Sequence, residues 1–406
     1  MDKLAIYGGE KFRKQPFPPR TPYGEEDFLQ VKEALESQDL FYTAGNKVAG
    51  FEKAFADTYG VKHCYTCSSG TASLHMAVAA LDPEPGGEVI TAPVTDFGTI
   101  AGLIFQGLIP VFADWMPDAL NMDPKSVEAK ITPKTCAIIV VHLFGNPCDM
   151  DAILDIARRH DLPVIEDCCQ AYLTYYKGRL CGTIGDIGCF SMQMSKHLPT
   201  GEGGCVITDN ERYASRMCLF RDKGWENRER FGPRAYSFLG TNYRMNELTA
   251  AVAISQLNKL EHTVSSMRAL ALELKNLLAD EPSLIAAPSL EGADASYWLF
   301  PIIVKTGDAE LFAKALQAEG VPFGYGYTGK PIYLCMEALT AKRTFGTSGY
   351  PFVSEFRDGE TAYAEGLCPV AERQLKQLIC FRIFENWTRE DIADVAGAVK
   401  KVVKYL

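Results

Sequence analysis

Residues 162–170 read LPVIEDCCQ, and residues 187–204 read IGCFSMQMSKHLPTGEGG. In the first segment an apolar run leads directly into an acidic pair, Glu166-Asp167. In the second, an apolar run ends in Ser191, and a lone Lys196 follows five residues later in a turn-like stretch. This order places a carboxylate at the end of one strand and an amine just past another, so both side chains are able to face one pocket.

A lysine and an aspartate in one pocket are what pyridoxal phosphate (PLP) chemistry requires. The lysine forms a Schiff base, and the aspartate keeps the pyridine nitrogen protonated so that the ring acts as an electron sink. Removal from water lowers the pKa of such a lysine, which suits it to imine formation and proton transfer. Taken alone, the same two residues also fit a helix cap and a solvated loop lysine, so the rest of the chain decides.

The bulk composition limits the kinds of partner. With 406 residues, the chain is long enough for one large domain and a smaller one. A net charge of −10 argues against a nucleic-acid or anionic-membrane partner. The N-terminal residues resemble no signal peptide and no window approaches a membrane span, so we expect a cytoplasmic protein.

The thirteen cysteines form no disulfide framework and are expected to be reduced. Residues 64–67 are formally a Cys-x-x-Cys pair. No second pair lies at metal-binding spacing and the chain has only six histidines, so we read this pair as strand residues. No metal site is expected.

Helical and strand patterns alternate from about residue 20 to residue 260. Such alternation, with buried β-branched runs, predicts a mainly parallel sheet flanked by helices, an α/β fold. The expected helices are 25–38, 49–60, 71–81, 99–106 and 149–160, and the expected strands are 63–67, 88–92, 109–113, 137–141 and 164–166.

The pattern changes in the last third of the chain. A long helix over 245–278, broken near Asn258-Lys259, is followed by a compact α+β region. We therefore divide the chain into a large cofactor-binding domain with an N-terminal arm (1–260) and a small C-terminal domain (261–406). The remaining expected elements are a strand over 298–304, a helix over 309–319, a functional loop over 325–351 and a closing helix over 388–405, with Thr388 as its N-cap.

A candidate anion-binding site lies near residue 70. The small residues Ser69, Gly70 and Thr71 directly follow a strand and open a helix, which leaves backbone N–H groups accessible to a phosphate. A plain N-cap is the alternative interpretation. Ser191 could donate a further hydroxyl, and the glycines of 200–204 form a turn that lacks the Gly-Lys-Ser/Thr ending of a nucleotide-binding loop.

Taken together, these motifs resemble the DegT/DnrJ/EryC1/StrS family of PLP-dependent aminotransferases, which act on keto-sugars and keto-cyclitols. The resemblance implies the fold type I architecture, with a mainly parallel seven-stranded sheet, and an obligate homodimer with composite active sites. The matching segments run nearly end to end: 51–52, 69–71, 110–114, 141–145, 166–167, 185–191, 196, 200–204, 240–245 and 256–257.

The resemblance also implies a role for individual residues. Lys196 is the Schiff-base lysine, Asp167 pairs with the pyridine nitrogen, and Gln170 lies near the ring hydroxyl. The remaining implied cofactor contacts are the phosphate-binding residues Ser69, Gly70, Thr71 and Ser191, the stacking ring of Phe97, and Asn242, which reaches the phosphate of the partner subunit.

The expected reaction is a ping-pong transamination through the Schiff base on Lys196, with glutamine or glutamate as the amino donor. A family branch that carries histidine in place of the lysine performs dehydration, and here the lysine is present, beside His197. Segments 4–9, 328–333, 350–352 and 368–372 resemble the glutamine:scyllo-inosose branch of antibiotic pathways, which favours a keto-cyclitol acceptor. A nucleotide-diphospho-keto-sugar is the alternative.

Three further questions stay open in the sequence. Tyr325, Tyr327 and Lys330 are candidate substrate contacts, although packing within their loop explains them equally well. A PLP-binding regulatory protein without turnover is a hypothesis of another class. The intact Lys196–Asp167 pair and the lack of a DNA-binding segment argue against it, and the choice between dimer and tetramer is not determined.

Overall fold

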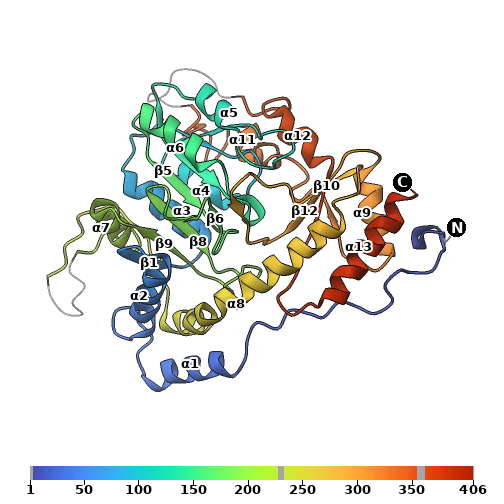
Figure 1. Ribbon diagram of the computed structural model, residues 1–406. Coiled ribbons are helices and arrows are strands. Elements are labelled where there is room, and N and C mark those ends of the chain that lie inside the picture. Colours follow the sequence, from blue (N-terminus) through green and yellow to red (C-terminus); the bar gives the residue numbers. More distant parts are fainter. Residues whose placement is uncertain (1–2, 227–232, 354–361, 406) are drawn as a thin grey trace.

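The computed structural model describes residues 3–226, 233–353 and 362–405 (Figure 1). A seven-stranded sheet has the strand order β1-β9-β8-β5-β4-β2-β3. β9 is antiparallel to both of its neighbours, and the five strands from β8 to β3 are parallel, so the predicted mainly parallel α/β sheet is confirmed. Its strands are β1 (His63–Cys67), β2 (Glu88–Thr91), β3 (Ile109–Phe112), β4 (Thr135–Val141), β5 (Val164–Asp167), β8 (Ile187–Ser191) and β9 (Gly204–Thr208).

The strands are buried on both faces, which explains their continuous apolar runs. Helices pack around this sheet, except η1, which lies with the smaller part of the molecule, and α1, which packs on α8. The elements are η1 (Ala5–Tyr7), α1 (Glu25–Glu36), α2 (Lys47–Tyr59), α3 (Gly70–Leu81), α4 (Gly98–Phe105), α5 (Pro124–Ala129), η2 (Leu143–Gly145), α6 (Met150–Arg159), α7 (Glu211–Phe220) and α8 (Glu247–Leu277). A small separate sheet contains β6 (Tyr175–Tyr176), β7 (Arg179–Leu180) and β11 (Ala293–Asp294).

The predicted break in the long helix near Asn258-Lys259 is wrong. α8 continues through both residues, because neither is a glycine or proline and the buried stripe continues from Leu257 to Leu260. Lys259 itself reaches across to α1, where its Nζ lies 2.6 Å from Asp27 Oδ2. In Figure 1 the resulting single helix runs from the large sheet to the smaller part of the molecule.

The smaller part is built on an antiparallel sheet with the order β10-β12-β14-β13. It closes the molecule at the side where both termini lie (Figure 1). Its elements are β10 (Leu284–Ala286), β12 (Phe300–Val304), α9 (Ala309–Ala318), β13 (Gly324–Tyr325), β14 (Leu378–Phe381) and α13 (Arg389–Val403), and the N-cap of α13 is Thr388, as expected.

The packing divides the chain differently from the predicted boundary at residue 260. That position falls inside α8, and the N-terminal segment packs on the small part: the Phe17 ring stacks on Trp387 at 4.3 Å. Conversely, Tyr333 and Leu375 belong to the core of the large sheet. Segments far apart in sequence share a core because apolar burial does not follow chain order.

The predicted loop over 325–351 contains short regular elements. It begins in β13 and contains α10 (Ile332–Cys335) and α11 (Glu337–Thr340), and α12 (Pro369–Leu375) follows further along the chain. Among the described residues, no helix has both the length and the apolar character needed to cross a bilayer.

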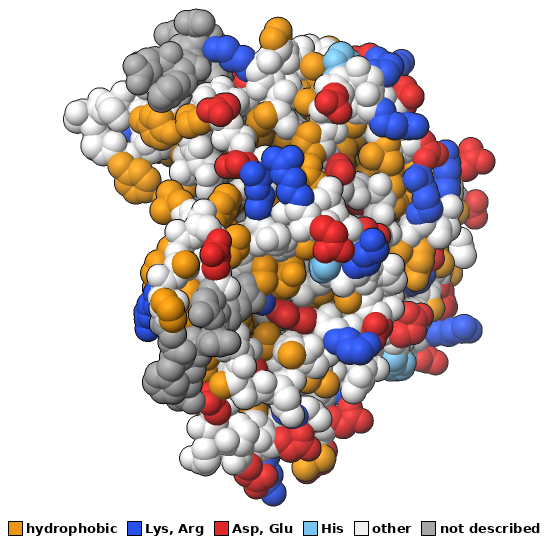
Figure 2. Space-filling model, turned by 90° about the vertical axis from the view of Figure 1, so that its left-hand side faces the viewer, with side chains coloured by type: hydrophobic (Ala, Val, Ile, Leu, Met, Phe, Trp, Pro, Cys, Tyr) orange, Lys and Arg blue, Asp and Glu red, His pale blue; other side chains and the backbone are white. Residues whose placement is uncertain are grey.

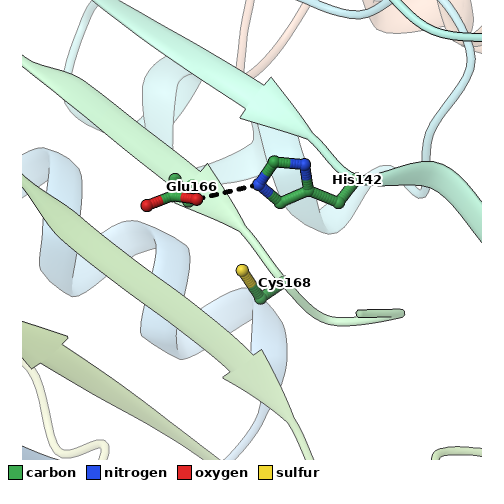
Figure 3. A group of neighbouring side chains, drawn as sticks. All are labelled: His142, Glu166 and Cys168. Carbon is green, nitrogen blue, oxygen red and sulfur yellow. Dashed lines mark hydrogen bonds and ion pairs between the residues drawn. The ribbon is translucent and has the colours of Figure 1, made fainter. Parts of the chain in front are cut away.

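A buried carboxylate fixes the edge of the sheet where β5 ends. Glu166 is fully buried, and its Oε1 accepts hydrogen bonds from the backbone N–H groups of Ile184 (2.7 Å) and Gly185 (2.6 Å). Its Oε2 accepts from the Gly182 N–H at 2.8 Å and lies 2.9 Å from His142 Nε2 (Figure 3). The His142 Nδ1 accepts from the Cys148 N–H, so Nε2 carries the hydrogen and donates to the carboxylate. Glu166 therefore ties β5 to the loop that leads into β8.

We predict that Glu166→Ala destabilises the protein by about 3–5 kcal/mol, because it leaves buried N–H groups and an imidazole without an acceptor. The midpoint of urea unfolding measures this change. The exposed Glu84, whose side chain makes no hydrogen bond with any described residue, gives the matched control Glu84→Ala, expected to shift stability by less than about 0.5 kcal/mol. Equal midpoints for the two variants would contradict the assigned role of Glu166.

Candidate active site

Asp167 lies at the carboxyl end of β5, one residue after the Glu166 anchor, and is 5% exposed. Its Oδ2 accepts a hydrogen bond from Thr99 Oγ1 at 2.8 Å, and its Oδ1 accepts from the Cys169 N–H at 3.0 Å. Because Thr99 donates its proton to Asp167, the 2.6 Å contact between Thr95 and Thr99 has Thr95 as donor. No cation pairs with Asp167 in the described part of the chain, so this buried carboxylate requires a positive charge from a ligand.

The N-terminus of α3 lies against the end of β8. Ser69 caps the helix, its hydroxyl accepting from the Ala72 N–H at 3.0 Å. Gly70 is required by close packing: a Cβ there would lie 2.6 Å from Ser191 Cβ. The N–H groups of Gly70 and Thr71 have no acceptor among the described residues and point out of the helix end. With the nearby hydroxyls they form a cradle suited to a phosphate.

Lys196 lies in the tight segment that connects β8 to β9. Its carbonyl accepts a hydrogen bond from Arg20 Nη1 at 2.7 Å, and the preceding Ser195 carbonyl accepts from Trp298 Nε1 at 2.8 Å. Arg20 is itself held by Glu385 at 3.0 Å, so the N-terminal arm and the small domain together fix the segment. The Lys196 Nζ lies 4.1 Å from the centroid of the Trp298 ring.

The surroundings of the Lys196 amine favour its uncharged form. Burial lowers the pKa of Lys196, the nearby side chains of Cys169, Asp167 and Asp96 oppose that shift, and the Arg382 cation adds to it. The net pKa is below the usual lysine value. An uncharged amine is the form that attacks a carbonyl carbon, so the site prepares Lys196 for imine formation.

Gln170 links the large domain to the loop after β13. Its Oε1 accepts from the Phe144 N–H at 2.8 Å, and its Nε2 donates to the Tyr327 hydroxyl at 3.0 Å. The Tyr327 oxygen thus serves as an acceptor for Gln170. The O–H hydrogen of Tyr327 is therefore available to another acceptor. Tyr327 lines the cavity that is described next.

These groups surround one cavity of about 350 Å³. It brings together eight residues predicted from the sequence: Ser69, Gly70, Thr71, Asp167, Gln170, Ser191, Lys196 and Tyr327.

Four predicted site residues do not line the cavity. Phe97 is the N-cap of α4 and is 36% exposed, and only its neighbours Asp96 and Gly98 reach the cavity wall, so this geometry does not support a stacking role. Tyr325 and Lys330 are exposed and are not among the residues that line it. Asn242 is exposed and lies outside the cavity of its own subunit, where its Oδ1 accepts from Arg244 Nε at 2.9 Å.

Sequence reasoning missed four lining residues that matter for the chemistry: Thr95, Thr99, Trp298 and Arg382. The two threonines lie beside Phe97 in a segment that was examined only for its aromatic ring. Trp298 and Arg382 come from the small domain, more than 100 residues from Lys196 in sequence. In the sequence, a tryptophan and an arginine near strand ends do not indicate a functional site, because their role depends on how the two domains pack together.

The sequence profile of the DegT/DnrJ/EryC1/StrS aminotransferase family matches residues 22–400. The chain belongs to this family. It is 32% identical to the L-glutamine:2-deoxy-scyllo-inosose aminotransferase of Streptoalloteichus tenebrarius, over 99% of this chain and 98% of the relative. It is 35% identical to a GDP-perosamine synthase of Caulobacter vibrioides, over 71% of this chain and 76% of the relative. The crystal structure of an aminotransferase from Psychrobacter cryohalolentis superposes with a TM-score of 0.83 at 30% identity, covering 95% of this chain and 98% of that one.

The chain is accordingly a PLP-dependent aminotransferase of fold type I. The residues that the structure assembles fit this cofactor. Asp167 is a buried carboxylate without a cation partner among the described residues, as a protonated pyridine requires, and the N–H groups at the α3 N-terminus suit an anion. Lys196, which lines the same cavity, offers the amine.

His197, the neighbour of the catalytic lysine in this aminotransferase, takes no part in the site. It is buried outside the cavity, and its Nε2 lies 3.0 Å from the Ser296 carbonyl. Burial lowers the pKa of His197 to about 3, so the ring is neutral and donates to that carbonyl. Of these two adjacent residues, only Lys196 lines the cavity.

A group of possible metal ligands lies behind the site: side-chain atoms of His142, Glu166 and Cys168 are within 4.8 Å of one another (Figure 3). Both Glu166 oxygens are occupied by backbone N–H groups, and burial raises the pKa of the Cys168 thiol well above its usual range. The group is thus explained by its hydrogen bonds, and the absence of a metal site stays a prediction.

We predict that Lys196 of the apoenzyme combines with PLP with a pH midpoint below the ordinary lysine pKa of about 10.4, because burial lowers its pKa. Asp96→Asn shifts the midpoint further down, because the Asp96 carboxylate stabilises the ammonium form. The initial rate of the change in PLP absorption, recorded between pH 6 and 11, measures both. A midpoint at or above the ordinary value, or an upward shift in the variant, contradicts the prediction.

Proposed function

We propose that this aminotransferase transfers an amino group from glutamine or glutamate to the ketone of a cyclitol. The site that combines Lys196, Asp167 and the α3 cradle carries the reaction type. The acceptor assignment rests on the relatives and on the cyclitol-branch segments of the sequence. The inosose aminotransferase aligns with 99% of the chain, whereas the GDP-perosamine synthase aligns with 71%. A nucleotide-diphospho-keto-sugar is the second candidate acceptor, because a relative of that kind is about equally similar where it aligns.

Each side chain has a definite task in this reaction. PLP, when bound, accepts the electron pair released as the donor's Cα–H bond breaks. Lys196, whose pKa is lowered by burial, would take the proton from the donor's Cα and, in the second half-reaction, would deliver a proton to the carbon of the former ketone. Asp167, fixed by Thr99 and the Cys169 N–H, keeps a proton on the pyridine nitrogen. The N–H groups of Gly70 and Thr71, with Ser191, hold the phosphate in place.

Tyr327 adds a directed hydrogen bond to the acceptor side of the cavity. Its oxygen already accepts from Gln170, so its hydrogen is available to an oxygen atom of a bound substrate. Desolvation by burial raises the pKa of Tyr327 well above its usual value, which keeps the group protonated as a donor. A polyhydroxylated ketone supplies oxygen acceptors around the whole ring, which suits this donor.

The absorption spectrum of the PLP-loaded protein tests the reaction type. We expect glutamine or glutamate to bleach the visible band of the wild-type protein, and 2-deoxy-scyllo-inosose or another ketone to restore it. In Lys196→Ala the band does not respond to the donor, because no amine remains to move the proton. A wild-type band that no common amino acid changes would overturn transamination and favour a PLP-binding regulatory protein. If only a nucleotide-sugar restores the bleached band, the acceptor is a nucleotide-diphospho-keto-sugar and not a cyclitol.

We further propose that the enzyme works as a homodimer with shared sites, and several exposed apolar side chains support this. On the face shown in Figure 2, hydrophobic side chains gather along the left-hand side, whereas charges of both signs mix over the right-hand half. Among the described residues, Leu239 is 90% exposed, Phe345 73% and Phe28 64%. An apolar groove beside α1, lined in part by Phe28 and Leu35, extends to Thr200 in the segment that carries Lys196.

Asn242 is suited to act in such a dimer. Its oxygen is occupied by Arg244, and Arg244 Nη1 in turn lies 3.1 Å from the buried Asp222. The amide NH₂ group is therefore left to donate outward, as a contact to the phosphate in the partner subunit requires.

We predict that mixing two inactive variants restores activity if the sites are shared. Lys196→Ala provides Asn242 to its partner, and Asn242→Ala provides Lys196, so a mixed dimer contains one complete site. After unfolding and refolding together, the mixture should recover roughly a quarter of wild-type activity, and light scattering should report a dimer. No recovery from a mixture that forms dimers would contradict the shared site, and a tetramer would extend the assembly.

We place the enzyme in the cytoplasm. All thirteen of its cysteines are free, as in a reducing compartment, and its proposed donors are common metabolites there. A role in making an aminated carbocycle, such as those found in antibiotics, follows from the proposed acceptor.

A further inference from the structure

The backbone of the segment that carries Lys196 is held by side chains from distant parts of the chain. Three successive carbonyl groups, those of Ser195, Lys196 and His197, accept hydrogen bonds from such side chains. Trp298 Nε1 donates to the first at 2.8 Å. Arg20 donates to the other two: its Nη1 lies 2.7 Å from the Lys196 oxygen and its Nη2 lies 3.2 Å from the His197 oxygen. One guanidinium group therefore holds the lysine backbone on both sides of the peptide bond that follows the lysine.

Arg20 reaches two consecutive carbonyls because its guanidinium is a planar fork. The N–H on Nε donates to the two oxygens of Glu385, at 3.0 and 3.1 Å. The Arg20 side chain is 9% exposed and that of Glu385 is 15% exposed, so the carboxylate compensates a largely buried charge. The hydrogen bonds of Arg20 to the lysine segment go to backbone atoms, and Arg20 is not among the residues that line the cavity.

Arg20 belongs to an N-terminal arm that the small domain holds at several points. Residues 16–22 include four prolines, which have no N–H to donate, so the carbonyl groups of this stretch make its polar contacts. Asn386 Nδ2 and Trp387 Nε1 donate to the carbonyls of the two prolines directly before Arg20, at 2.8 and 3.1 Å. Both donors directly follow Glu385 in sequence. One short stretch of the small domain thus sets the position of Arg20.

We infer that Arg20 is a positioning residue for Lys196 and that it couples the small domain to the bond between the lysine and PLP. This inference rests on the proposed role of Lys196. The lysine must release the cofactor when the donor amine replaces it, and must then stay close enough to move a proton. A backbone held at consecutive carbonyls leaves only the side chain to move between these tasks. Because that backbone is ordered before PLP binds, less conformational entropy is lost when the bond forms.

The alternative is that Arg20 only stabilises the packing of the arm, and the chain offers a matched control for it. Arg13 lies in the same arm, its side chain is 11% exposed, and it pairs with Asp391 at 2.6 Å and with Asp394 at 2.8 Å, both on α13. None of its hydrogen bonds or ion pairs with the described residues reaches the segment 195–197. Loss of Arg13 therefore weakens the attachment of the arm and leaves the lysine segment in place.

Equilibrium dialysis of the apoenzyme against PLP tests the inference in two backgrounds. With Lys196 present, Arg20→Gln should weaken PLP binding about tenfold or more, because charged hydrogen bonds are lost, and Arg20→Lys should recover part of that loss. In the Lys196→Ala background, Arg20→Gln should change PLP affinity by less than about twofold, because Arg20 acts only through the lysine. Arg13→Gln should leave PLP affinity unchanged in both backgrounds, although its urea midpoint falls as that of Arg20→Gln does.

Equal weakening by Arg20→Gln in both backgrounds would overturn the inference, because Arg20 would then act on the fold and not on the lysine. An unchanged affinity with Lys196 present would overturn it as well. If Arg20→Gln does not fold, Glu385→Gln decides in the same two backgrounds, and it should weaken PLP binding only where Lys196 is present. If Lys196→Ala binds PLP as tightly as wild type, the proposed function itself fails. A weaker Lys196→Ala without any effect of Arg20 overturns this inference alone.

Discussion

The active site depends on one buried carboxylate, Glu166. It receives three backbone N–H groups from the loop before β8 and one imidazole N–H from His142, without contact with solvent. These bonds hold the ends of β5 and β8 side by side. The next residue on β5 is Asp167, β8 ends at Ser191, and Lys196 follows five residues later. Because β5 and β8 are adjacent and parallel, one polar anchor helps to set the positions of both Asp167 and Lys196.

The charges in the cavity are left unbalanced by the protein. Asp167 lacks a cation, the α3 N-terminus lacks an anion, and Arg382 lacks a carboxylate, all among the described residues. In the proposed reaction the cofactor would supply a pyridinium for Asp167 and a phosphate for the cradle. Electrostatic complementarity of this kind allows a chain of net charge −10 to bind anionic molecules, because the local field and not the total charge decides binding.

The predictions that succeeded rest on local features of the sequence. Strand ends next to acidic or hydroxyl residues, and small residues at a helix start, are properties of a few consecutive positions. Ser69, Gly70, Thr71, Asp167, Ser191 and Lys196 were found in this way or through the family motifs, and all line the cavity. The predicted break in α8 is wrong: the polar pair Asn258-Lys259 does not end the helix. Lys259 instead forms a long-range ion pair with Asp27, which holds α1.

The sequence by itself determined the α/β fold, the cofactor and the reaction type, and it predicted Asp167 and Lys196 as the catalytic pair, since each depends on short segments whose chemistry is readable in order. The tertiary structure alone decided which distant residues complete the site. Arg20 reaches the Lys196 carbonyl across 176 positions, and Trp298 reaches Ser195 across 103. Such contacts arise when the arm and small domain pack against the large sheet. The free energy of that packing comes from apolar burial spread over many residues, so no single position in the sequence predicts them.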